Sequence, residues 1–323
     1  MKFIFMFLLC LFSLSSCNIK TNEVSVSATS YIVIEQSTNK ILQGNNYDVS
    51  RSVASISKIM TAIVAIENID VNKTVKVPSE INKVYGSSIY LKADQQITIL
   101  DLLYGLMLRS GNDAAITLAV SVSKNVDSFV DLMNKKADGL GLKGTYFNNP
   151  HGLDEQDDGN ISTAYDMAIL YSYCLKNELF AKITQTTQYK TYVNKNRLVR
   201  TYTHCTGGKT GFTKKAKRTL VTSASKDNIN LIVVTLNCGG DFKTHQDIYE
   251  SYFNTHKSIK ILNKGENSFN NVIFNCKHDY FFLTNLDEVN LHYFINYKGN
   301  YVEITLLDKN KRVVDYIKVN INI

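Results

Sequence analysis

The stretch Ser55-Ile56-Ser57-Lys58-Ile59-Met60-Thr61-Ala62-Ile63-Val64 decides the fold, because the hydrophobic pattern of the chain changes there. Apolar side chains stand at positions 56, 59, 60, 63 and 64, which is the spacing of one face of an α-helix. Upstream, residues 31–35 and 41–42 have the composition of two short strands around the polar turn 37–40. We therefore expect a β-hairpin followed by a buried helix.

Helical patterns fill the middle of the chain, and strands return after it. We expect helices over residues 98–108, 113–122, 126–137 and 163–174. Strands are expected at residues 189–193, 200–205, 218–224 and 229–236, before a helix over 244–253. Strands on both sides of a helical segment predict an α+β fold, in which the terminal strands share one sheet covered by helices.

The end of the chain has strand patterns only, at residues 271–274, 280–283, 289–294, 302–307 and 313–319. We expect a small β-rich domain over residues 257–323, after a larger domain over residues 29–255.

Composition excludes several classes of protein. The 323 residues are 44% hydrophobic and 20% charged with two prolines, which excludes disordered, collagen-like and low-complexity chains. The net charge of +7 suits a polyanionic neighbourhood such as cell wall, anionic lipid or nucleic acid. The charge does not choose among these partners.

The N-terminus has the pattern of an export signal. After Lys2, residues 3–14 are apolar except for one serine, which matches a secretory signal too short to span a bilayer. Leu14-Ser15-Ser16-Cys17 resembles a bacterial lipobox, so we expect a signal peptide over residues 1–16, a lipid on Cys17 and a tether over residues 17–28. The alternative is an ordinary signal peptide with a chance cysteine. Either way, we expect an exported bacterial protein, and the lipid would hold it on the outer face of the cytoplasmic membrane.

The remaining cysteines and the histidines do not have the spacing of metal ligands. Four cysteines stand far apart in the chain, at 174, 205, 238 and 276, and the six histidines are equally scattered. We expect no metal and no cofactor. An exported chain can form disulfides, but the sequence does not select a pair.

Ser55-Ile56-Ser57-Lys58 places a serine and a lysine on one helix face, where the amine can reach the hydroxyl. An unprotonated lysine there could act as general base towards a serine nucleophile, and the helix N-terminus favours a developing oxyanion. Alone the signal is weak, because Ser-x-x-Lys recurs at 37, 121 and 223.

Two further motifs follow in order, Ser110-Gly111-Asn112 between two helices and Lys209-Thr210-Gly211 on a strand. With this set, the chain resembles the penicillin-recognising serine enzymes. More narrowly, about residues 29–255 resemble the low-molecular-mass D-alanyl-D-alanine carboxypeptidases. Five longer segments carry this resemblance: ASISKIMT (54–61), RSGNDAA (109–115), NPHGL (149–153), NISTA (160–164) and GKTGFT (208–213). The resemblance implies a β-lactamase/transpeptidase-like antiparallel sheet.

The resemblance also implies catalytic roles for four residues. Ser55 would attack the carbonyl between the terminal D-alanines of a peptidoglycan stem peptide, giving an acyl-enzyme that water hydrolyses. Lys58 would be the base, and Ser110 would relay a proton to the leaving amine. Asn112 would hold both the substrate amide and Lys58. β-Lactam antibiotics would acylate the same serine.

Four further residues would bind substrate. Lys209 would supply positive potential, which helps to keep Lys58 neutral, and Thr210 would hydrogen-bond the carboxylate. Gly211 would let the substrate backbone approach the strand. The N–H groups of Phe212 and Ser55 would form the oxyanion hole.

The chain departs from the family pattern at several places. The family has glycine where this chain has Lys217, and many members carry a carboxylate-binding arginine where residues 241–246 offer only Lys243 and His245. The chain ends in a strand pattern rather than an amphipathic membrane-binding helix. We expect the imidazole of His151 to tie a loop and leave it out of the catalytic set.

Two alternative functions share these motifs. A class A β-lactamase needs a glutamate in a Glu-x-x-x-Asn pattern, whereas Glu155 and Asn160 stand five residues apart. A non-catalytic wall-binding protein could keep the fold, although every catalytic position is intact. We expect no nucleic-acid binding, because the basic residues are not clustered and the chain is exported.

Overall fold

The computed structural model describes residues 24–154, 159–269, 272–276, 279–285, 292–299, 301–307, 311 and 313–321. The predicted signal peptide, Cys17, most of the predicted tether, and Glu155 lie outside these residues. In the described part, no helix is long and apolar enough to cross a bilayer.

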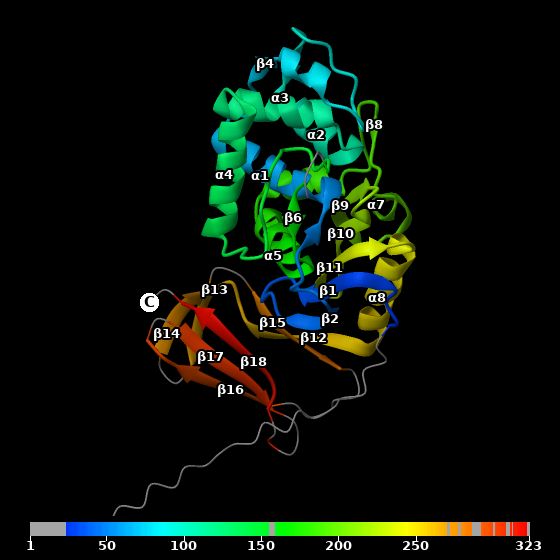
Figure 1. Cartoon of the computed structure of the whole chain (residues 1–323). Helices are drawn as coiled ribbons and strands as arrows, with labels where there is room; N and C mark the ends of the chain where they lie inside the picture. The colour runs from blue at the N-terminus through cyan, green and yellow to red at the C-terminus, as the bar shows by residue number, and fades with distance from the viewer. Residues whose placement is uncertain are drawn as a thin grey trace, which may run out of the picture.

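A five-stranded antiparallel sheet forms the centre of the larger part (Figure 1). Its strand order is β2-β1-β11-β10-β9, and the strands are β1 (Ala28–Glu35), β2 (Ile41–Asn45), β9 (Cys205–Thr213), β10 (Lys217–Lys226) and β11 (Ile229–Cys238). Strand β1 pairs with β11 across most of its length. The strands before and after the helical segment therefore share one sheet, as predicted.

Helices cover both faces of this sheet. One face carries η1 (Ala54–Ser57), α1 (Lys58–Asn68), α2 (Ile99–Arg109), α3 (Asn112–Ser123), α4 (Val126–Gly139), α5 (Ala164–Leu175) and α6 (Glu178–Gln185). The other face carries α8 (Asp241–Thr255). Successive side chains of a strand point to opposite faces, so Ile32 packs with the first set and Val33 with α8.

Short elements join these layers. They are η2 (Ser79–Lys83), α7 (Leu198–Thr201), β3 (Arg51–Ser52), β4 (Thr74–Lys76), β5 (Gln96–Thr98), β6 (Ile161–Ser162), β7 (Gln188–Tyr189) and β8 (Tyr192–Val193). The predicted helix that starts at residue 98 is capped by Thr98, whose hydroxyl accepts a hydrogen bond from the Asp101 backbone N–H at 3.1 Å.

Two sequence predictions in this part were wrong. Residues 200–204 are not a strand, and β9 begins only at Cys205, because α7 occupies 198–201 with Leu198 buried and the Thr201 hydroxyl donates to the carbonyl oxygen four residues earlier. Residues 189–193 form two short strands rather than one, since Lys190 has a φ of 51° and turns the chain. Helix α6 was not predicted, although Asn177 caps it through the Phe180 N–H at 3.0 Å.

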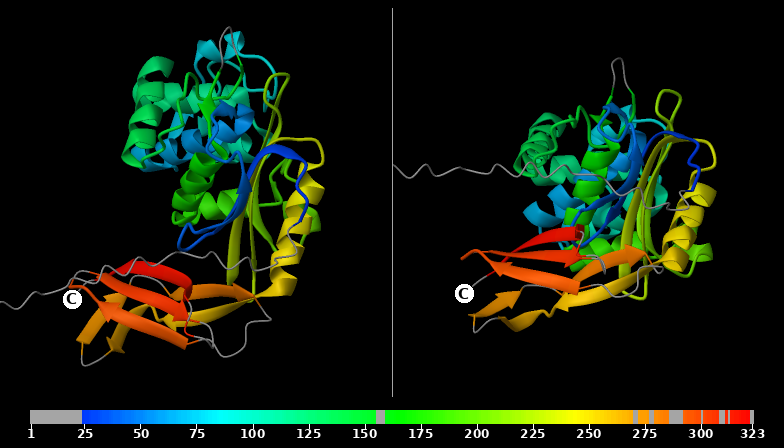
Figure 2. Two further views of the ribbon diagram at one scale, coloured as in Figure 1. Left: turned by 60° about the horizontal axis from the view of Figure 1, so that its bottom comes forward. Right: turned by 90° about the horizontal axis from the view of Figure 1, so that it is seen from below.

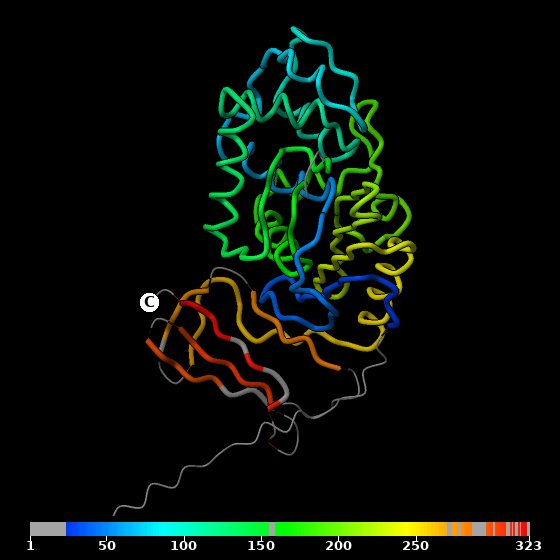
Figure 3. Tube along the Cα trace, viewed as in Figure 1, coloured from blue at the N-terminus to red at the C-terminus, as the bar shows by residue number. Residues whose placement is uncertain are grey.

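The C-terminal part is β-rich, as predicted. It contains β12 (His256–Leu262), β13 (Gly265–Phe269), β14 (Val272–Cys276), β15 (Tyr280–Asn285), β16 (His292–Tyr297), β17 (Tyr301–Leu307) and β18 (Val313–Asn320). Strands β12 and β13 were not predicted. These strands form separate small sheets around their own apolar core, which includes Phe274, Phe282 and Val302. They lie beyond the end of α8 (Figure 2). The chain passes into them from α8 through β12 (Figure 3).

Candidate active site

The three motifs meet at one cleft of about 370 Å³. Its lining residues are Ser55, Ser87, Ser110, Lys195, Thr210, Gly211, Phe212, Arg218, Asp241 and Phe242. The other predicted site residues, Lys58, Asn112 and Lys209, are buried and bonded to each other or to the lining serines. The structure thus brings all eight predicted catalytic and substrate-binding residues together.

Ser55 and Lys58 lie at the N-terminal end of the helix that their sequence predicted. A 3₁₀ turn, η1, carries Ser55, and α1 begins at Lys58. Their spacing of three residues places the Lys58 Nζ 3.0 Å from the Ser55 Oγ. This is a distance at which a proton can pass directly between hydroxyl and amine.

Two further acceptors hold the Lys58 amine. The Nζ lies 2.7 Å from the Asn112 Oδ1 and also contacts the backbone oxygen of His151. A neutral amine has two N–H groups and one lone pair. If the N–H groups bond to Asn112 and His151, the lone pair is left for the Ser55 hydroxyl.

The surroundings of Lys58 favour that neutral form. Its side chain is 0% exposed, and burial lowers its pKa well below the ordinary value of 10.5. The positive charges of Lys209 and then Lys195 lower this pKa further, whereas Asp113 raises it. Burial and the neighbouring cations therefore favour a neutral, basic amine beside the Ser55 hydroxyl.

Ser110 and Lys209 form a second serine–lysine pair. The Lys209 Nζ donates to the Ser110 Oγ at 3.0 Å and to the Thr210 backbone oxygen at 2.7 Å. Ser110 ends α2 in the left-handed conformation, with φ 63°, and α3 begins two residues later at Asn112. Burial, and then Lys195, lowers the pKa of Lys209 to about 7.

Strand β9 is the outer strand of the sheet, and Gly211 brings it against the nucleophile. A Cβ at Gly211 would lie 2.4 Å from the Thr219 Oγ1 and 3.0 Å from the Ser55 backbone N. Only glycine allows this approach. In the described residues β9 pairs with β10 only, and the part of its other edge that lines the cleft, at Thr210 and Gly211, is available to an extended substrate.

The loop 149–153 supports η1, and the sequence assigned no catalytic role to it, although NPHGL matches the family there. Gly152 has φ 81°, and a Cβ on it would lie 2.2 Å from the Ala54 oxygen, so the loop is pressed against the turn. The buried imidazole of His151 accepts the Leu153 N–H at 3.2 Å, which agrees with the prediction that it ties the loop. Burial and then Lys58 lower its pKa to about 3. His151 therefore contributes its carbonyl to the site.

Sequence reasoning missed four charged or aromatic residues in the cleft. Lys195 follows β8 and donates to the Ser87 Oγ at 2.8 Å. Arg218 begins β10, and Asp241 and Phe242 begin α8. None of the four belongs to a motif, so only the folded arrangement identifies them.

Lys243 and His245, the two cations of the segment in which many family members carry an arginine, are not in the cleft. His245 is 0% exposed and lies between Thr222 and Thr235. Lys243 is paired with Asp247 on the outside of α8, with 78% of its side chain exposed. Lys217, which replaces the family glycine, has φ 58°, a conformation that glycine adopts without strain.

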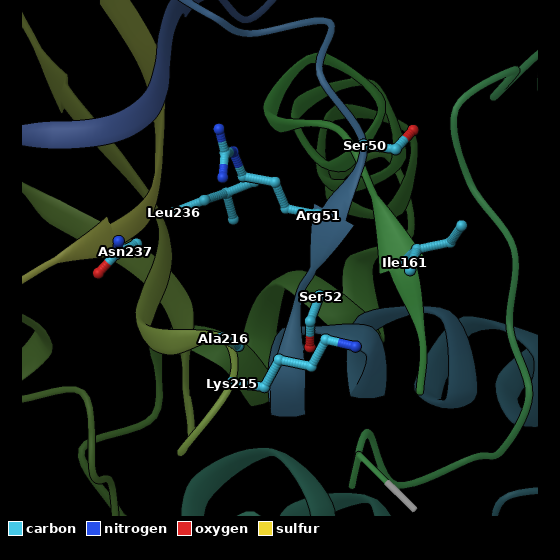
Figure 4. Close-up of a pocket in the computed structure, with 8 residues that line it drawn as sticks. All are labelled: Ser50, Arg51, Ser52, Ile161, Lys215, Ala216, Leu236 and Asn237. Atoms are coloured by element: carbon cyan, nitrogen blue, oxygen red, sulfur yellow. The ribbon is translucent and has the colours of Figure 1, made fainter. Parts of the chain in front are cut away.

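A second hollow lies beside β3 and contains none of the predicted residues. It is lined by Ser50, Arg51, Ser52, Ile161, Lys215, Ala216, Leu236 and Asn237. In Figure 4 the Arg51 guanidinium points towards Leu236, whereas the Lys215 amine points towards Ser52. The two cations therefore do not converge on one ligand.

The described ranges contain neither a cluster of metal ligands nor a disulfide. There, no group of three or more His, Cys, Asp or Glu side chains could hold a metal ion. Cys174, Cys205, Cys238 and Cys276 are free thiols.

Comparison with known proteins agrees with this geometry. The family model for D-alanyl-D-alanine carboxypeptidase, peptidase family S11, matches residues 17–240. The D-alanyl-D-alanine carboxypeptidase DacF of Bacillus subtilis is 38% identical in an alignment of 231 residues that covers 67% of this chain and 58% of that protein. DacB2 of Mycobacterium tuberculosis is 32% identical over 217 residues, covering 65% of this chain and 74% of that protein.

A solved structure extends the likeness to the C-terminal strands. Penicillin-binding protein 5 from Haemophilus influenzae superposes with a TM-score of 0.80 at 26% identity, covering 93% of this chain and 97% of that one. Matching motifs, cleft and fold lead to one conclusion. The chain belongs to the D-alanyl-D-alanine carboxypeptidase family, peptidase family S11.

Proposed function

We propose that this protein is a serine D-Ala-D-Ala carboxypeptidase, which removes the terminal D-alanine from peptidoglycan stem peptides. The observation that carries the proposal is the buried Lys58 amine, 3.0 Å from the Ser55 hydroxyl in a cleft bounded by an open strand edge. Named relatives with this activity support the substrate class.

In the acylation step, neutral Lys58 takes the hydroxyl proton of Ser55 while the Oγ attacks the carbonyl carbon of the scissile bond. The resulting oxyanion is bound by the backbone N–H groups of Ser55 and Phe212. Ser110, held by Lys209, relays a proton to the amine of the departing D-alanine: it gives up its own hydroxyl proton and regains one from the Lys58 ammonium, which returns to the neutral form. The C–N bond breaks, and Ser55 carries the acyl group.

Deacylation and substrate positioning use the same groups. Water attacks the acyl ester with Lys58 as the base, and the released Oγ regains its proton. The substrate backbone lies along β9 beside Gly211, and Asn112 holds its amide. Charged Lys209 attracts the substrate, and Thr210 donates to its carboxylate. β-Lactam antibiotics are proposed to acylate Ser55 by the same route.

We further propose where the protein acts and how it is divided. The sequence supports export by a signal peptide over residues 1–16, and a lipid on Cys17 would hold the enzyme at the outer face of the membrane. The catalytic domain would cover residues 29–255 and the β-rich domain residues 257–323. A Cys17→Ala variant should move from the detergent phase to the aqueous phase, and unchanged partitioning would contradict the lipid.

The activity is tested by labelling with fluorescent penicillin, mapping the modified peptide, and measuring D-alanine release from a pentapeptide. Ser55→Ala should lose both the label and the release. Ser121→Ala is the matched control, because it alters another Ser-x-x-Lys motif, at the end of α3. Rapid penicillin hydrolysis without a lasting label would instead identify a β-lactamase, and no D-alanine release from the wild type would refute the proposal.

A further inference from the structure

We propose that Arg218 binds the carboxylate of the leaving D-alanine, an inference that rests on the proposed carboxypeptidase activity. The segment 241–246 does not supply the cation expected there, because His245 is buried and Lys243 points away. The cleft nevertheless contains an arginine from a different element, because Arg218 stands near the start of strand β10.

The strand register places Arg218 beside Thr210. In β10, Thr219 and Val221 face the helices of the larger layer, since the Thr219 hydroxyl bonds the Val53 oxygen and Val221 joins that core. Arg218 and Leu220 therefore face α8. Thr210 is the cross-strand partner of Leu220, so it shares this face with Arg218.

The position also agrees with the size of the substrate. The carboxylate of a terminal D-alanine is one residue away from the scissile carbonyl, about 4 Å along the chain. A group that binds it must therefore lie in the same cleft as Ser55. Arg218 meets this condition, because both residues line the 370 Å³ cleft together with Thr210.

Neighbouring side chains hold the Arg218 guanidinium but leave donors available. One terminal nitrogen lies 2.7 Å from the Asp241 Oδ1, and the guanidinium carbon lies 5.3 Å from the centre of the Phe242 ring. Asp241 also accepts the Phe242 N–H at 2.8 Å, which fixes the carboxylate at the start of α8. A guanidinium has five N–H donors, and its buried Nε has no protein partner within the described residues.

The charge of the cleft suits an anion. The lining includes the cations of Lys195 and Arg218 against the single carboxylate of Asp241, and the buried Lys209 amine donates to Ser110 of the lining. Asp241 therefore acts as a positioning residue for Arg218 without cancelling the positive potential. With 42% of its side chain exposed, Arg218 remains accessible to a ligand.

The experiment compares an acyl-D-Ala-D-Ala peptide with its C-terminal methyl ester, which lacks the anionic carboxylate. In the wild type, kcat/KM should be higher for the acid. Arg218→Gln should lower kcat/KM for the acid about 10- to 100-fold, the effect of losing a charge-assisted hydrogen bond, and change the ester much less. Arg218→Lys should restore part of the acid preference.

Controls separate this role from others. Lys243→Gln removes the same charge from α8 outside the cleft and should leave the acid-to-ester ratio unchanged. A circular dichroism spectrum and the stoichiometry of penicillin labelling establish the folded fraction of each variant. If Arg218→Gln lowers kcat/KM equally for the acid and the ester, Arg218 has a structural role. If only Lys195→Gln lowers the acid-to-ester ratio of kcat/KM, the carboxylate binds Lys195. Both outcomes would overturn this inference while leaving the carboxypeptidase activity intact, whereas an inactive wild type would refute that activity itself.

Discussion

The catalytic cleft and the C-terminal strands bury different kinds of side chain. Beside the cleft, two lysine amines are almost completely removed from water, at 0% and 1% exposure for Lys58 and Lys209. The C-terminal part instead buries apolar groups such as Phe282 and Val302. A buried amine lowers the free energy of unfolding, whereas a buried phenyl ring raises it. Replacing a buried lysine beside the cleft should therefore lower activity and raise stability. Replacing a buried aromatic residue in the C-terminal part should lower stability and leave activity unchanged.

The largest effect is expected at Lys58. Lys58→Met should lower the rate of acylation by penicillin about 10²- to 10⁴-fold, the usual contribution of a general base. The same variant should be more stable at pH 7 by about 1–2 kcal/mol, because a buried amine with a lowered pKa is replaced by an apolar chain of similar length. Stopped-flow labelling and thermal unfolding measure the two effects.

The sign of the stability change follows from proton binding. The unfolded chain keeps the ordinary lysine pKa, whereas the pKa of folded Lys58 is lower, so the unfolded state binds more protons between the two values. The penalty of burial is therefore greatest at low pH and declines as pH rises. Lys135→Met, on the exposed surface of α4, should change neither quantity. A less stable Lys58→Met variant would contradict this account of the cleft.

Phe282 should show the opposite behaviour. Its ring is 1% exposed in the C-terminal core, so Phe282→Ala should destabilise that part by about 3–5 kcal/mol. Limited proteolysis should cut β12–β18 faster, while the penicillin acylation rate remains that of the wild type. Ile273→Ala, at 56% exposure, is the matched control with little expected effect. Loss of acylation in Phe282→Ala would show that the two regions are not energetically separate.

Gly211 tests whether the cleft depends on backbone contact as well as on charge. In Gly211→Ala, the new methyl group would meet the Thr219 hydroxyl and the Ser55 N–H, and β9 would have to move away from η1. We expect acylation to fall about 10²-fold, since misplacing one oxyanion donor costs that much. Gly239→Ala has no atom within 4 Å of the new Cβ and should be neutral. Equal rates in the two variants would contradict the close approach of β9.

The sequence predicted the parts of the fold in which pattern and local chemistry agree. The stripe from Ile56 to Val64 is buried in α1, and the cap at Thr98 opens α2. Residues 200–204 were mispredicted because their β-branched and aromatic side chains favour a strand, whereas backbone bonds back to residues 197 and 198 form a short helix. Local propensity was overridden there by tertiary packing of Leu198.

The residues of the candidate site likewise fall into a group that the sequence predicted and a group that it did not. Ser55, Ser110 and Lys209 were predicted because they belong to motifs with fixed spacing. Lys195 and Arg218 carry no motif, and they reach the cleft only when β8, β10 and α8 assemble around it. A side chain that reaches a site only through the folded arrangement leaves no local sequence pattern, which is why the sequence left open which group replaces the family arginine of segment 241–246.

Lys195 provides the smallest expected effect and tests the electrostatics of the buried lysines. Its charge is a secondary cause, after burial, of the lowered pKa of Lys209, and it also lowers the pKa of Lys58. Lys195→Gln removes this repulsion, so both ammonium forms become more favourable and both pKa values should rise. The shift should be small, because solvent and salt screen a charge at the edge of the cleft.

The measurement is the acylation rate constant as a function of pH. Deprotonation of Lys58 gives the rising limb and deprotonation of Lys209 the falling limb, so both limbs should move to higher pH in Lys195→Gln. The control Lys176→Gln removes an exposed charge at the end of α5 and should leave the profile in place. Adding salt should reduce the difference between wild type and Lys195→Gln, because the effect is Coulombic. If both limbs stay at the same pH and only the maximal acylation rate constant falls, Lys195 positions Ser87 or the substrate and does not set the pKa values of the two lysines.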